Sequence, residues 1–120
     1  MVIHAAGMNA VSCETDPIKA IKFNGEVTAI LAKKAVSCGV KNFIYFSTAH
    51  VYSENLFGFF NESSDVTNSH PYATSHKSGE DSVIRLVNSG EINGVILRLS
   101  NAFGAPIDPS IDCWSLLVND

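Results

Sequence analysis

Short, nearly continuous apolar runs occur at three places along the chain. They cover residues 2–6, 42–47 and 94–99, and polar residues or glycines bound them. A run of this length and character is typical of a parallel strand that is covered on both faces. The pattern therefore predicts three strands in a buried parallel sheet.

Two longer stretches, in which apolar residues recur at helical intervals, separate these runs. The first covers 18–36 and follows Asp16-Pro17, where aspartate can cap a helix and proline suits its first turn. The second begins at Pro71 and continues to residue 87. Connections of this length join parallel strands through right-handed crossovers. The predicted fold class is α/β, a βαβαβ unit that forms the second half of a doubly wound, Rossmann-type parallel sheet.

Composition narrows the functional classes. The 120 residues are 46% hydrophobic and 17% charged, which is typical of a globular protein. The net charge is −4 and the basic residues are scattered, so we expect no nucleic-acid partner. No apolar run approaches the roughly 18 residues that span a membrane, and the N-terminus lacks a secretion signal. The expected compartment is the cytoplasm, with no membrane partner.

The cysteines and histidines show no spacing typical of metal ligands. Cys13, Cys38 and Cys113 form no CxxC pair, and the four histidines are not spaced as zinc ligands. We therefore expect reduced thiols and no metal site.

Small and hydroxyl-bearing residues follow the predicted strands at the edge where open parallel sheets bind their ligands. Small residues there let a flat cofactor approach the backbone, but they can also simply turn the chain. A hydroxyl group at a strand end can likewise hydrogen-bond a ligand, or it can hydrogen-bond the backbone and stabilise a turn. These residues are Ala5, Ala6, Gly7, Ser47, Thr48, Ser100 and Asn101.

Tyr72 begins the second predicted helix, directly after Pro71. A tyrosine can act as a general acid or base if a nearby cation lowers its pKa from about 10. Side chains three or four positions further along the helix can face it. The alternative is a tyrosine that packs on the preceding loop.

Several segments resemble, in order and spacing, the extended short-chain dehydrogenase/reductase family, the NAD-dependent epimerases and dehydratases of nucleotide sugars. The resemblance extends from Val2 to about Pro106. Val27 stands where the family usually has a glycine. The segments that carry the resemblance are 2–7, 16–17 with 23–28, 46–52, 71–75 with Glu80, and 98–104.

The resemblance implies hydride transfer between a sugar carbon and the nicotinamide of NAD or NADP, with NAD favoured. Tyr72 would exchange the hydroxyl proton, Thr48 would hydrogen-bond the sugar oxygen, and His76 would complete the catalytic set. It also implies a nucleotide-sugar substrate and a homo-oligomer. The implied cofactor-side residues are Ala5, Ala6, Gly7, Asn24, Ser47, Thr48, Tyr72, His76 and Ser100, and the substrate-side residues are Asn9, His50 and Asn101.

His76 is a departure from the family pattern, because the family has a lysine four residues after the tyrosine. Lys77 comes one position later. On a regular helix, residue +4 lies about 40° around from Tyr72 and residue +5 about 140° around, so His76 should face Tyr72 and Lys77 should not. With an ordinary pKa near 6.5, His76 would be partly charged at pH 7. It could donate a hydrogen bond to a cofactor ribose, but it would support a tyrosinate less well than lysine.

The absence of a glycine-rich phosphate loop anywhere in the chain is a second departure from the family pattern. The sequence therefore predicts one partial NAD(P)-binding domain over 1–120, without the N-terminal glycine-rich half and most of the C-terminal substrate domain. We expect the isolated chain to be inactive and to bind NAD weakly. It should self-associate through the edge strand 2–6, where backbone groups would be unpaired, or exchange segments. Part of the helices that would cover one face of the sheet is also absent, so we expect apolar surface to be exposed on that face.

Two other interpretations remain at this point. One is a catalytically idle relative that binds NAD or a sugar nucleotide in a regulatory role, which His76 in place of lysine favours. The other is an unrelated parallel-sheet interaction module.

Overall fold

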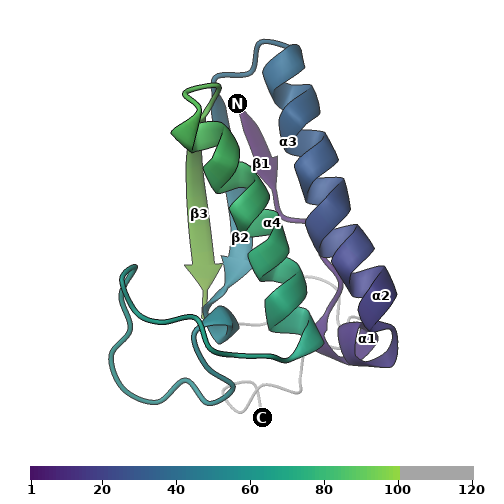
Figure 1. Cartoon of the computed structure of the whole chain (residues 1–120), viewed down its shortest axis with the longest axis vertical. Coiled ribbons are helices and arrows are strands. Elements are labelled where there is room, and N and C mark those ends of the chain that lie inside the picture. The colour runs from purple at the N-terminus through teal and green to yellow at the C-terminus, as the bar shows by residue number, and fades with distance from the viewer. Residues whose placement is uncertain (101–120) are drawn as a thin grey trace, which may run out of the picture.

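Three parallel strands form the sheet in a computed structural model, which describes residues 1–100 (Figure 1). They are β1 (Val2–His4), β2 (Asn42–Thr48) and β3 (Asn93–Leu99), and their spatial order is β1-β2-β3. The α/β fold class and the order of the strands are confirmed. The first strand is shorter than predicted, because its pairing with β2 ends at His4, opposite Tyr45.

Helices connect the strands and cover one face of the sheet (Figure 1). Within the described residues, no helix is both long and apolar enough to cross a membrane. The helical elements are α1 (Ala10–Thr15), α2 (Pro17–Ala20), the π-helical segment η1 (Ile21–Val27), α3 (Thr28–Ser37), the short 3-10 turn η2 (Ala49–Val51) and α4 (Pro71–Asn88).

The helix starts and stops follow from local residue types. The Asp16 side chain accepts a hydrogen bond from the Lys19 backbone N–H at 2.9 Å, as expected of a cap. Gly39 and Gly90 end α3 and α4 with φ values of 74° and 73°, a left-handed conformation that favours glycine. The short helix α1 was not predicted; Asn9 caps it by accepting a hydrogen bond from the Ser12 N–H.

The first predicted helix contains a π-helical segment instead of a regular α-helix throughout. In η1 the wider turn places Asn24 and Gly25 in the interior, where they are buried next to α4. Such segments are rare and often occur at functional sites. Their presence depends on the packing of the neighbouring helix, which hydrophobic periodicity does not report.

The core lies between the sheet and the helices. Phe43 and Tyr45 from β2 are fully buried and pack with Val83 of α4. Ala32 and Ala35 of α3 complete this core cluster.

The opposite face of the sheet is apolar and exposed. Side-chain exposure is 55% for Ile3 and 51% for Val95, and Leu97 and Leu99 on β3 are exposed as well. The expected exposure of apolar surface on one sheet face is thus seen within residues 1–100, because the two long helices, α3 and α4, both pack on the other face (Figure 1). Self-association of the isolated chain stays a prediction, and this face adds to the apolar surface available for it.

Gly79 allows α4 to lie against η1, and its replacement provides a test of this packing. A Cβ there would lie 2.7 Å from the Asn24 carbonyl oxygen and 2.7 Å from the Tyr45 hydroxyl oxygen. Glycine to alanine inside a helix ordinarily stabilises by about 1 kcal/mol. We expect Gly79→Ala to lower the free energy of unfolding by roughly 1–3 kcal/mol instead, because the core is overpacked. Denaturant titration measures this.

Gly25→Ala is the matched control. Its Cβ would meet the Ser78 hydroxyl oxygen at 2.7 Å, which can rotate away, and the Ser78 Cβ at 3.1 Å, which needs only a small shift. The loss of stability should therefore be smaller than for Gly79→Ala. A stabilised Gly79→Ala protein would contradict the close approach of the two helices.

Candidate active site

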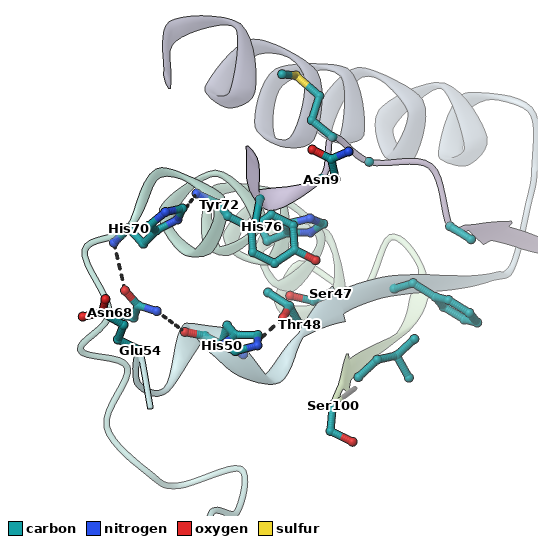
Figure 2. A pocket seen from close by; sticks show the side chains of 16 residues that line it. Asn9, Ser47, Thr48, His50, Glu54, Asn68, His70, Tyr72, His76 and Ser100 are labelled. Carbon is teal, nitrogen blue, oxygen red and sulfur yellow. Dashed lines mark hydrogen bonds between the residues drawn. The ribbon is translucent and has the colours of Figure 1, made fainter. Parts of the chain in front are cut away.

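A crevice of about 700 Å³ lies at the carboxyl-terminal ends of the strands (Figure 2). This is the edge where open parallel sheets bind their ligands. The loop after β1, the end of β2, the start of α4 and the end of β3 all contribute to it. Most of the residues that the sequence singled out line this crevice: Ala5, Gly7, Asn9, Ser47, Thr48, His50, Tyr72, His76 and Ser100.

Among the described residues, two of the predicted ones, Ala6 and Asn24, do not line it. Asn101 lies outside the described residues, and Ala6 belongs to the same loop as Ala5 and Gly7 but does not contribute to the lining. Asn24 is buried behind the wall, with 1% exposure.

The Asn24 amide is used by the protein itself. Its Oδ1 accepts a hydrogen bond from the Met8 backbone N–H at 2.8 Å, and its Nδ2 donates to the Ser75 hydroxyl at 3.0 Å. A buried polar side chain whose atoms are all bonded within the protein is a positioning group. Asn24 therefore ties the loop after β1 to α4, rather than presenting its amide to the crevice.

Tyr72 and Thr48 reach the crevice from different elements and meet there. Figure 2 shows the Tyr72 hydroxyl directed toward the end of β2, where Ser47 and Thr48 lie. The Thr48 hydroxyl oxygen accepts a hydrogen bond from the His50 backbone N–H at 3.1 Å, so its own proton is free to be donated. Two hydroxyl groups thus lie together at one point of the wall, which suits an oxygen-bearing substrate.

Burial raises the pKa of Tyr72, while its hydrogen bond with Thr48 acts in the opposite direction. At neutral pH the side chain is therefore an uncharged phenol, with a proton to donate. The expectation of a cation that lowers this pKa is not met by the residues described.

His76 lies directly beside Tyr72. The two rings meet edge to face with centroids 4.7 Å apart, as the helical spacing predicts. Burial lowers the pKa of His76 to about 4; the Glu80 carboxylate opposes this shift and His4 adds to it. The expectation of a partly charged imidazole at pH 7 is wrong, because the ring is buried and therefore neutral.

Lys77 points away from the crevice, as predicted. Its ammonium group forms a salt bridge with Asp81, one turn further along the exposed side of α4. The only lysine next to Tyr72 in the sequence therefore places no charge near the phenol.

Ser47 has its hydroxyl committed to a buried carboxylate. It donates a hydrogen bond of 2.6 Å to Oε1 of Glu80, which is fully buried in α4. Arg98 from β3 donates to both Glu80 oxygens, at 2.9 and 2.7 Å, and its guanidinium lies over the Tyr52 ring. Ser47 thus positions the end of β2, although part of the residue also lines the crevice.

The rim of the crevice includes residues that the sequence analysis missed. Asn68 donates to the His50 carbonyl oxygen at 2.8 Å and accepts from the His70 N–H at 2.9 Å (Figure 2). His70 then caps α4, since its Nδ1 accepts the Tyr72 backbone N–H at 3.2 Å. Histidine is not among the preferred capping residues, so local sequence rules do not find it. Glu54, Met8, Ala10, Phe46 and Leu99 are the other unpredicted lining residues.

The wall formed by the loop after β1 fits a flat ligand. Ala5 and Gly7 of this loop, and Ala10 at the start of α1, have small side chains or none, while Met8 and Asn9 line the same wall with longer side chains. A Cβ on Gly7 would lie 3.2 Å from Cε1 and 3.4 Å from Nε2 of His76, so this position leaves little room for a larger residue. The small residues leave that side of the crevice open, which suits the close approach of a nicotinamide dinucleotide.

The chain is similar in sequence and in fold to known proteins. The model of the NAD dependent epimerase/dehydratase family matches residues 1–112. A dTDP-D-glucose 4,6-dehydratase of Mus musculus is 34% identical over 107 residues, which are 87% of this chain and 30% of that protein. The chain thus spans less than a third of the length of this curated relative.

Solved structures show the same arrangement of elements. A UDP-glucose 4-epimerase of Thermotoga maritima, solved with UDP-glucose, has a TM-score of 0.80 at 27% identity, covering 91% of this chain and 36% of that one. RMD of Pseudomonas aeruginosa, solved with NADPH, has a TM-score of 0.80 at 23% identity, covering 92% and 39%, and supports the fold alone. Structures similar to this chain thus include one that binds a nucleotide sugar and one that binds NADPH.

The buried, neutral His76 makes stability depend on pH. In the unfolded chain histidine has a pKa near 6.5, whereas in the folded protein that of His76 is about 4. Between these two pKa values the unfolded state binds more protons than the folded state. The stability that neutral His76 contributes is therefore fully present above about pH 6.5 and is lost as the pH falls toward 4. The loss should reach about 3 kcal/mol. The lowered pKa of His4 acts in the same direction.

Denaturant titrations between pH 4 and 7 measure this dependence. In His76→Asn the free energy of unfolding should change less with pH than in the wild type, and the change that remains should come from His4. An unchanged pH dependence would contradict a neutral, buried His76.

Proposed function

The chain belongs to the NAD dependent epimerase/dehydratase family, and we propose that it carries the proton-transfer centre of an enzyme that acts on a nucleotide sugar. Because the chain spans 30% of its mouse relative, the proposal concerns the complete gene product. The observation that supports it most is the meeting of the Tyr72 and Thr48 hydroxyl groups in one crevice, beside a wall of small residues.

Tyr72 is the proposed proton-transfer group. Its hydroxyl is that of an uncharged phenol, which suits donation of a proton to a sugar carbonyl oxygen during reduction. Donation leaves Tyr72 as a phenolate, and in the reverse direction this phenolate takes the proton of the sugar hydroxyl and becomes the phenol again. Thr48 orients the same oxygen, because its hydroxyl proton is not used by the backbone.

The cofactor in this proposal is NAD or NADP, with NAD favoured by the description of the family. Its nicotinamide would accept or return the hydride of the sugar carbon. Ala5, Gly7 and His76 would lie along the dinucleotide, with Ser100 at the end of β3. Asn9 and His50, on the remaining walls, would face the sugar nucleotide.

One observation favours a second candidate, an idle relative that binds NAD or a sugar nucleotide without turnover. His76 is neutral, and Lys77 is paired on the exposed side of α4, so no cation from residues 1–100 lies near the Tyr72 hydroxyl. A tyrosinate is harder to form without such a cation. Binding without turnover in the wild-type gene product would favour this candidate.

Tyr72→Phe tests the proposed enzyme. The complete gene product should convert UDP- or dTDP-linked glucose in the presence of NAD, and Tyr72→Phe should lower kcat by about 10²–10⁴-fold, since the proton-transfer group is lost. Product analysis by chromatography and NADH absorbance measure turnover. Tyr52→Phe is the matched control, because Tyr52 packs against Arg98 and Phe60 outside the crevice. Full activity of Tyr72→Phe would remove Tyr72 from the mechanism.

His76 and Lys77 form a second comparison. His76→Ala should lower kcat/KM well beyond Lys77→Ala, because only His76 shares the face of α4 that bears Tyr72. Lys77→Ala serves as the control for changing this turn of the helix. The reverse ranking would show that the ammonium group reaches the crevice during the reaction.

A further inference from the structure

A second tyrosine lies behind the crevice wall and contacts His76. Tyr45 of β2 is fully buried, and its hydroxyl oxygen lies 3.0 Å from Nδ1 of His76. The same oxygen lies 3.4 Å from the Asn24 carbonyl oxygen of η1. The Thr28 hydroxyl also acts on this phenol, as a hydrogen-bond donor that lowers its pKa. The phenol's own proton has two acceptors among these contacts, Nδ1 of His76 and the Asn24 carbonyl oxygen.

The 3.0 Å between the phenol oxygen and Nδ1 suits a hydrogen bond in either direction, whereas the 3.4 Å contact with the Asn24 carbonyl is at best weak. If Nδ1–H donated to Tyr45, the buried phenol proton would be left with only that weak contact, so donation from Tyr45 to Nδ1 is favoured. If Tyr45 donates to Nδ1, the neutral imidazole of His76 must carry its own proton on Nε2.

Nε2 lies at the edge of the ring that faces the crevice. Cε1 and Nε2 are the His76 atoms nearest to a Cβ placed on Gly7, and both residues line the crevice. Every buried side-chain nitrogen or oxygen within residues 1–100 has a hydrogen-bond partner. Nε2 is bonded to none of these residues, so it must be accessible from the crevice.

We propose that Tyr45 is a positioning residue that holds His76 as its Nε2–H tautomer, so that an uncharged N–H donor faces the crevice beside Tyr72. Its ligand would be an oxygen acceptor, such as a ribose hydroxyl of the dinucleotide. The identity of this ligand rests on the proposed function, whereas the tautomer does not.

The surroundings of His76 agree with an uncharged donor. The groups that face it are His4 from β1, Tyr45 from β2, and Tyr72 and Glu80 from its own helix. The Glu80 carboxylate is engaged by Arg98 and Ser47 rather than by the imidazole. Ring stacking with Tyr45, at a centroid distance of 6.1 Å, restricts the orientation of His76 further.

Nitrogen NMR of the intact protein, labelled with ¹⁵N in histidine only, tests the tautomer directly. The His76 signals are assigned by their loss in His76→Asn. At pH 7 the wild type should show a protonated Nε2 and an unprotonated Nδ1. In Tyr45→Phe, Nδ1 loses its donor, so the ring should exchange between the two neutral tautomers. A protonated Nδ1 in the wild type, or an unchanged tautomer in Tyr45→Phe, would overturn the proposal.

Tyr52→Phe is again the control, since it also removes the hydroxyl of a buried tyrosine and should leave the His76 signals unchanged. Titration of the complete gene product with NAD supplies a second readout. Tyr45→Phe should weaken NAD binding by about three- to tenfold, the effect of one hydrogen bond that is no longer oriented.

The two proposals fail separately. The expected tautomer in a gene product that converts no nucleotide sugar supports the positioning role and rejects the enzymatic one. Turnover of a nucleotide sugar together with a protonated Nδ1 in the wild type supports the enzymatic role and rejects the positioning role of Tyr45.

Discussion

The buried carboxylate of Glu80 is the constraint on which the arrangement of the site depends. A fully buried charge is stable only when it is paired and hydrogen-bonded, and removal of one partner from such a pair commonly costs about 3–5 kcal/mol. Arg98 supplies two hydrogen bonds from β3, and Ser47 supplies one from the end of β2. These contacts fix the rotation of α4 relative to the sheet. Tyr72, His76 and Glu80 are four residues apart in succession, so the same rotation directs the first two toward the crevice.

Close packing between α4 and η1 is the second requirement. Gly79 has no side chain, and therefore the Asn24 carbonyl and the Tyr45 hydroxyl can lie directly against the helix. Asn24 in turn holds the loop after β1 through the Met8 N–H. The wall of small residues is thus positioned by a buried amide that does not itself face the ligand space.

The chemistry of the site follows from its low polarity. Burial keeps Tyr72 a phenol and His76 a neutral imidazole, since neither ring has an opposite charge close enough to offset the loss of solvation. A crevice with hydroxyl groups and an N–H donor suits recognition of hydroxyl-rich ligands by hydrogen bonds. At the position where the family has a charged lysine, this chain has His76, an uncharged hydrogen-bond donor that Tyr45 orients from behind the crevice wall.

The order of strands and helices, the location of the crevice and the facing of His76 toward Tyr72 were determined by the sequence alone. Each depends on the spacing of apolar residues within one element or on where a strand ends, and both can be recognised from residues that are close together in the sequence. The register of α4 is an example, because four residues separate Tyr72 from His76 in any regular helix.

Only the tertiary structure decided the charge of His76, the use of Asn24 and the role of Tyr45. The pKa of His76 depends on burial by segments far away in the chain, and its partner Tyr45 is 31 residues distant. The π-helical segment has the same origin, since it depends on the packing of η1 against α4. Hydrophobic periodicity shows that a residue faces inward, but the groups that meet it there are set by packing between distant elements.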